Sequence, residues 1–183
     1  KIKCKFKKIE YLPNGKINSD SNESLRKGLC SCDVPSAKTL TLLLQGVTGH
    51  GKSTHINALV NFLLDIKLKD RFRYVCCESD SSVAGHANKQ TMHVTSYHIP
   101  SSLIKNRLTG GDEPCCVNLV DVPGFGDIRG EHAESEIWAM IKNCLEGLES
   151  IDYILMVIKA TENSFSSAQG RIFAKMNELY KNQ

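Results

Sequence analysis

A glycine-rich segment at residues 46–54 carries the residue types that bind the phosphates of a nucleotide. It reads GVTGHGKST and matches the pattern G-x-x-x-x-G-K-[ST]. Glycines in such a loop let successive backbone N–H groups face phosphate oxygens, and a following helix adds its positive N-terminal end. Lys52 can reach the β- and γ-phosphates, and the Ser53 hydroxyl can ligate Mg²⁺. We therefore predict nucleotide contacts from eight residues: Gly46, Thr48, Gly49, His50, Gly51, Lys52, Ser53 and Thr54.

A second polar segment, DVPGFGD at 121–127, follows an apolar run. The N–H of Gly124 can approach a γ-phosphate and release it after hydrolysis, which would make the loop sensitive to the nucleotide. An Asp-x-x-Gly sequence by itself indicates only a turn after a strand, but here it follows a phosphate-binding loop in the chain. Lys52 and Gly124 are therefore the predicted catalytic groups.

Three side chains are candidate ligands of a Mg²⁺ ion. Asp121 ends an apolar run, where a carboxylate can hold the ion, usually through water. Ser53 supplies a hydroxyl from the phosphate-binding loop. Thr91, in a polar connection before an alternating strand, can complete the shell in the triphosphate state, with Thr95 as its competitor.

Strand and helix patterns alternate from residue 38 onward and place these segments. We expect strands at about 39–45, 92–99, 115–121 and 151–158, and helices at about 52–66, 131–148 and 166–180. Pro100 ends the second strand, and the last strand reads as buried. This alternation predicts an α/β fold with a mostly parallel sheet covered by helices on both faces. Ligands of such sheets bind beyond the carboxyl ends of the strands, where the phosphate-binding loop falls.

Length and composition favour one globular domain. The chain has 183 residues, of which 41% are hydrophobic and 23% charged. We expect residues 1–37 to form a leader of strand and loop, and 38–183 to form the nucleotide-binding domain. A chain that begins without Met and ends at Gln183, after a helical pattern, is expected to be a fragment.

The net charge of +3 is too small to predict a nucleic acid or membrane partner. The lysine-rich run in residues 1–8 could touch acidic lipid or RNA, or be a solvated edge, so membrane contact is not indicated. No apolar stretch reaches the ~20 residues that span a bilayer. The eight cysteines lack the paired C-x-x-C spacing of a zinc site, and we read them as reduced thiols of a cytoplasmic protein.

The segments GVTGHGKSTHINAL at 46–59 and VDVPGFGD at 120–127 resemble the GTPases grouped around septins, immunity-associated GTPases and chloroplast-import receptors. The resemblance covers about residues 38–183. It implies the three-layer P-loop fold, GTP or GDP as ligand with Mg²⁺, and self-association across the nucleotide face. Val122 departs from the family's usual Asp-Thr-Pro-Gly.

The family's base-reading motif [NT]-K-x-D is absent from these residues, since Asn88-Lys89 lacks the aspartate. The family pattern would place it after the last helix, so we expect the C-terminal part of the fold to be missing. The residues present do not by themselves distinguish guanine from adenine.

Phe125 stands where a water-positioning glutamine would follow Gly124, so we expect slow hydrolysis of GTP to GDP and phosphate, or help from another group. The candidates are a residue of a partner across a dimer face, His50 and Arg129. His50 either faces a partner's nucleotide or is an exposed imidazole without a role. The leading function is a GTP-dependent switch; the alternatives are a GTP-dependent assembly module with negligible turnover and a P-loop ATPase or kinase.

Overall fold

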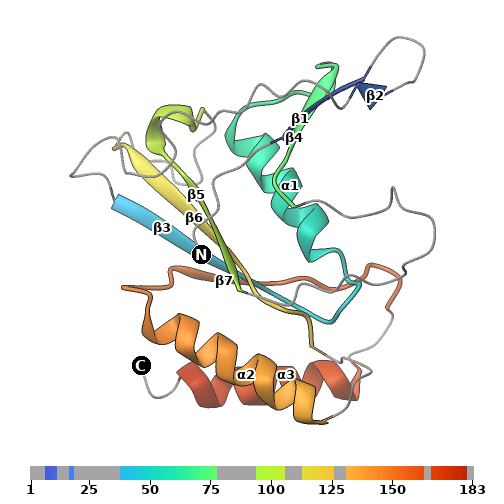
Figure 1. Cartoon of the computed structure of the whole chain (residues 1–183), viewed down its shortest axis with the longest axis vertical. Helices are drawn as coiled ribbons and strands as arrows, with labels where there is room; N and C mark the ends of the chain where they lie inside the picture. The colour runs from blue at the N-terminus through green and yellow to red at the C-terminus, as the bar shows by residue number, and fades with distance from the viewer. Residues whose placement is uncertain are drawn as a thin grey trace.

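The computed structural model of the chain describes residues 7–11, 17–18, 38–77, 94–105, 113–125, 131–162 and 166–180. Within these ranges a four-stranded sheet lies between helix α1 on one face and helices α2 and α3 on the other (Figure 1). This three-layer arrangement confirms the predicted α/β fold class. The helices are α1 (Lys52–Leu63), α2 (Glu131–Glu146) and α3 (Ser167–Tyr180).

The four-stranded sheet has the order β5-β6-β3-β7 and is mostly parallel. Its strands are β3 (Lys38–Gln45), β5 (Thr95–Ile99), β6 (Cys115–Asp121) and β7 (Tyr153–Met156). Strands β6 and β7 run parallel to β3, whereas β5 is antiparallel to β6. Pro100 follows β5 as predicted, and a short 3₁₀ turn, η1 (Ser101–Leu103), comes next.

Alternate residues of β3 supply both faces of the core, because side chains of a strand point to opposite sides of the sheet. Leu42 and Leu44 pack with Ile56 and other residues of α1. Leu43 packs on the opposite face in a cluster with residues of α2 and α3. A strand buried on both faces reads as a continuous apolar run, which explains the sequence of β3.

Strand β7 is less buried than its sequence suggests. Tyr153 is 55% exposed and Ile154 is 39% exposed, so the prediction of a buried strand is wrong for these residues. Among the described strands β7 lies at the edge of the sheet, where the helices that cover the inner strands give less shelter.

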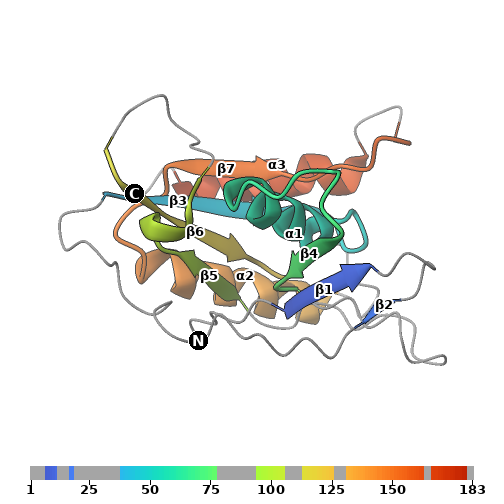
Figure 2. The same ribbon diagram turned by 90° about the horizontal axis from the view of Figure 1, so that it is seen from above.

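A smaller antiparallel sheet, ordered β2-β1-β4, lies beside α1 (Figures 1 and 2). It contains β1 (Lys7–Tyr11), β2 (Ile17–Asn18) and β4 (Phe72–Val75). Two of its strands therefore come from the expected strand-and-loop leader. Strand β4 was not predicted.

Two asparagines of α1 hold the backbone of β4 and of the two residues that follow it. The Asn61 Oδ1 atom accepts from Tyr74 N at 2.9 Å, and its Nδ2 atom donates to Tyr74 O at 2.7 Å. One turn earlier, Asn57 Oδ1 accepts from the N–H groups of Cys76 and Cys77 at 2.9 and 3.0 Å. Asn57 Nδ2 donates to Cys77 O at 2.9 Å. The helix that follows the phosphate-binding loop is thus fastened directly to β4.

Candidate functional site

The loop at residues 46–51 connects the carboxyl end of β3 to the first turn of α1. Gly49 and Gly51 have φ values of 77° and 91°, a left-handed conformation in which side chains are strained. The N–H of His55 donates to Gly51 O at 2.9 Å, so the helix starts immediately after the loop. The unpaired N–H groups of a helix start are a natural anion site.

Lys52 lies over this loop with its side chain buried. Its Nζ atom donates to the carbonyl oxygens of Gly46 at 3.1 Å and Val47 at 3.4 Å. Burial lowers the pKa of Lys52, and the charge of Asp121 acts in the opposite direction. These contacts fix the position of the amine over the loop.

The segment after β6 touches the phosphate-binding loop directly, through its backbone. Thr48 N donates to Phe125 O at 2.9 Å, and Phe125 N donates to Gly46 O at 3.3 Å. A Cβ atom on Gly124 would lie 2.5 Å from Thr48 Oγ1 and 2.7 Å from Lys52 Nζ. Only glycine fits between the two loops, so the two predicted motifs meet at Gly124.

Phe125 points into the core instead of toward the loop. Its ring is fully buried and stacks on Trp138 of α2, with ring centroids 4.4 Å apart and an interplanar angle of 26°. This residue therefore anchors the segment after β6 to α2, and its ring has no group that could orient a water molecule.

Asp121 is a buried carboxylate at the end of β6. Its side chain is 2% exposed, and burial raises its pKa to about 6 against the opposing charge of Lys52. Among the described residues, Asp121 Oδ1, Thr48 Oγ1 and His50 Nδ1 are buried without a hydrogen-bond partner. Buried polar atoms are rarely left unpaired. The residues thus fit a polar ligand such as a phosphate with its Mg²⁺.

Within the described part of the chain, no cluster of three or more His, Cys, Asp or Glu residues could hold a metal by itself. Magnesium usually takes one or two carboxylates together with water and substrate phosphates, so Asp121 with the Ser53 hydroxyl suits it. Ser53 and Thr54 lie in the first turn of α1, where Thr54 is exposed. Thr91 and Arg129 lie outside the described residues.

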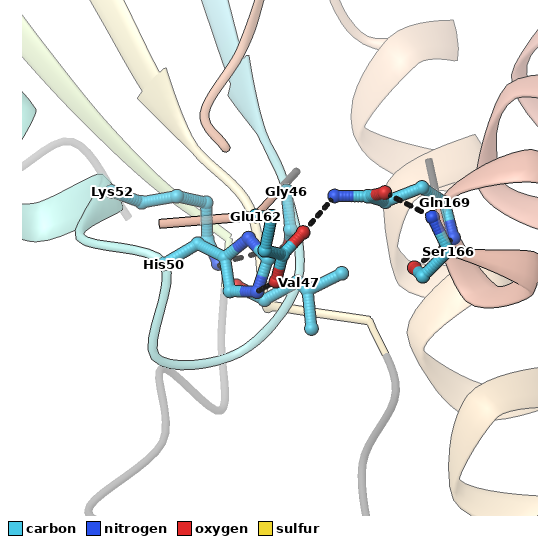
Figure 3. A network of polar contacts seen from close by, with 7 residues as sticks. All are labelled: Gly46, Val47, His50, Lys52, Glu162, Ser166 and Gln169. Atoms are coloured by element: carbon cyan, nitrogen blue, oxygen red, sulfur yellow. Dashed lines mark hydrogen bonds and ion pairs between the residues drawn. The ribbon is translucent and has the colours of Figure 1, made fainter. Parts of the chain in front are cut away.

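His50 is held by a residue that the sequence analysis missed. Its Nε2 atom lies 3.1 Å from Glu162 Oε1, and its side chain is only 6% exposed, so the interpretation as an exposed imidazole is wrong (Figure 3). Glu162 follows β7 and belongs to no motif. The one local sequence signal nearby is the Ser166-x-x-Gln169 spacing of a capping box.

A phosphate-binding loop between a parallel strand and a helix, facing a buried aspartate on the adjacent strand, defines a P-loop NTPase. Residues 41–182 match the family model described as 50S ribosome-binding GTPase. Because the match covers most of the chain, the protein belongs to this family of P-loop GTPases, which supports a guanine nucleotide as its ligand. The family description attributes binding of the 50S ribosome to members of the family. No curated protein matches the chain.

None of the described helices is long and apolar enough to cross a membrane.

Proposed function

We propose that the protein binds GTP, hydrolyses it slowly with Mg²⁺ and acts as a nucleotide-dependent switch, with residues 38–183 as its GTPase domain. The observation that carries the proposal is the close approach of Gly124 to the phosphate-binding loop, where an added Cβ would lie 2.5 Å from Thr48 Oγ1 and 2.7 Å from Lys52 Nζ. The orphaned buried oxygen of Asp121 supports a Mg²⁺-bound nucleotide as ligand.

The chain's own groups would act mainly by position and charge, which is what phosphoryl transfer requires. The N–H groups of residues 46–54 would surround the phosphates, and Lys52 would neutralise charge on them. Ser53, Thr91 and Asp121 would hold Mg²⁺, which would supply positive charge to neutralise the phosphates when bound. Gly124 would hold the γ-phosphate through its N–H. Because the Phe125 ring is turned into the core, unaided turnover should be low.

The switch would use the same contacts. Loss of the γ-phosphate would release the N–H of Gly124, and the neighbouring Phe125–Trp138 stack would carry that change to α2. The motifs at 46–59 and 120–127 resemble those of septins, immunity-associated GTPases and chloroplast-import receptors. This likeness supports self-association across the nucleotide face.

Fluorescent GTP titration of wild type, Lys52→Ala and Lys142→Ala tests binding. Lys142 is an exposed lysine paired with Glu146, so it is the matched control. We expect Lys52→Ala to lose most of the affinity and Lys142→Ala to keep it. Competition by ATP as effective as by GTP would favour the ATPase or kinase alternative.

Turnover is tested by measuring phosphate release per molecule over a wide range of protein concentration. We expect the rate per molecule to rise as the protein self-associates. A flat rate would contradict catalysis across a dimer face. Nucleotide-dependent assembly with negligible release would support the alternative of an assembly module, which the inward-facing Phe125 ring also favours.

A further inference from the structure

A chain of polar contacts joins the phosphate-binding loop to the first turn of α3. His50 Nε2 lies 3.1 Å from Glu162 Oε1, and Gln169 Nε2 donates to the other carboxylate oxygen of Glu162 (Figure 3). Ser166 N donates to Gln169 Oε1 at 2.6 Å, and Gln169 N donates to Ser166 Oγ at 3.2 Å. The last two contacts form a capping box at the start of α3, and this box fixes the side chain of Gln169, which in turn holds Glu162.

Burial fixes the two side chains that contact Glu162, whose own side chain is 29% exposed. The side chain of His50 is 6% exposed, and Gln169 is 1% exposed. Both oxygens of Glu162 are engaged, by His50 and by Gln169. Glu162 accepts from Nε2, which therefore carries a proton.

The other ring nitrogen of His50 lacks a partner. Nδ1 is buried without a hydrogen bond among the described residues. The residue lies in the phosphate-binding loop, so a phosphate is a candidate partner for this nitrogen. A phosphate oxygen can accept a hydrogen bond from Nδ1–H, and this requires the imidazolium form.

We propose that Glu162 is a positioning residue of the nucleotide site: it holds His50 so that Nδ1–H donates to a phosphate oxygen of the bound GTP. The inference rests on the proposed function, since it needs a nucleotide in the loop. His50 also shields the phosphates from the carboxylate of Glu162. Without the imidazole, Glu162 would repel the ligand.

The test is GTP affinity in four proteins: wild type, His50→Ala, Glu162→Ala and the double variant. Losing one hydrogen bond to a charged group should weaken binding about 10- to 100-fold in either single variant. The double variant should bind more tightly than His50→Ala alone, because it also removes the repelling carboxylate. The proposal would be overturned if the fold-losses in GTP affinity of the two single variants multiply in the double variant. A Glu162→Ala protein that binds GTP like wild type would also overturn it.

Conservative variants separate a positioning role from a structural one. His50→Gln keeps a donor for Glu162 but lacks one for phosphate, so it should bind about as weakly as His50→Ala. Glu162→Gln keeps a hydrogen-bond acceptor without the charge, so its GTP affinity should fall between those of Glu162→Ala and wild type. It is also the variant to test if Glu162→Ala does not fold. Glu146→Ala, an exposed glutamate on α2, is the control and should not change affinity. Equal GTP affinity of Glu162→Gln and wild type would count against the proposal.

The unfolding temperature of the nucleotide-free proteins is the second readout. A purely structural role would lower it without changing the GTP affinity of the folded protein. If wild type and Lys52→Ala bind GTP equally weakly, the proposed function fails and the inference with it. If Lys52→Ala loses affinity while the Glu162 series stays level, only the inference fails.

Discussion

Replacing Asp121 by an amide should stabilise the nucleotide-free protein and remove a candidate Mg²⁺ ligand. The side chain is 2% exposed, and burial raises its pKa from 3.8 to about 6. One pKa unit corresponds to about 1.36 kcal/mol, so ionised Asp121 lowers the unfolding free energy by about 3 kcal/mol. The ionised carboxylate of Asp121 therefore destabilises the nucleotide-free protein.

The sign of the pH dependence follows from which state holds the proton more tightly. Folded Asp121 keeps its proton up to about pH 6, whereas the unfolded chain releases it near pH 3.8. Stability is therefore lost as the pH rises through this window. The loss is small near pH 4, about half complete near pH 5, and complete above about pH 7.

The assay is urea unfolding of wild type and Asp121→Asn in EDTA, without nucleotide, from pH 8 to pH 4. We expect the variant to gain about 2–3 kcal/mol at pH 7.5 and less than about 1 kcal/mol near pH 4. Glu149→Gln changes an exposed carboxyl and should show no such gain. A gain that is absent at pH 7.5, or that persists unchanged at pH 4, would refute the reasoning.

Three further substitutions test contacts around the same site. Gly124→Ala puts a Cβ 2.7 Å from Thr48 Cα, so fluorescent GTP titration should show affinity about tenfold lower; unchanged affinity would contradict the close approach. Phe125→Ala removes a buried ring and should lower the unfolding free energy in urea by about 3–5 kcal/mol, with Phe125→Leu losing less because it keeps most of the buried apolar volume; a Phe125→Leu protein as stable as wild type would argue against the aromatic stack. Asn61→Ala breaks two hydrogen bonds to Tyr74 and should speed hydrogen exchange of the Tyr74 amide; Asn61→Asp keeps an acceptor but places a carboxylate oxygen beside the carbonyl oxygens of Tyr74 and Asn57, so it should speed exchange as well. Equal protection in all three proteins would show that β4 does not depend on this asparagine.

Local patterns predict the elements beside the site closely. The strand expected at 115–121 is β6 to the residue, and the helix expected at about 52–66 is α1, which ends at Leu63. These elements have short-range signals: an apolar run buried on both faces, and a glycine loop before a helix. The strand expected at 92–99 begins only at Thr95 and runs antiparallel to its neighbour, and strand direction has no local signal.

Contacts between distant residues are what the sequence does not reveal. Strand β4 pairs with β1 and is held by Asn61 of α1, and its four residues, FRYV, are too few to show a period although aromatic and β-branched residues favour a strand. Glu162 meets His50 only because the chain after β7 passes the phosphate-binding loop. Thr91 and Arg129 remain predictions, since both lie outside the described residues.

The asparagine contacts of α1 are possible because the rise of one helical turn is close to the rise of two residues of extended chain. Four residues of a helix rise about 6.0 Å, and two residues of a strand rise about 6.6 Å. Asn57 and Asn61 can therefore meet the N–H groups of Cys76, which directly follows β4, and Tyr74, two residues apart in an extended stretch of chain. The difference between the two rises adds up with each further asparagine contact. A helix can therefore take the place of a neighbouring strand only over a short distance. The contacted residues, Tyr74, Cys76 and Cys77, stay within that limit, and of these only Tyr74 belongs to β4.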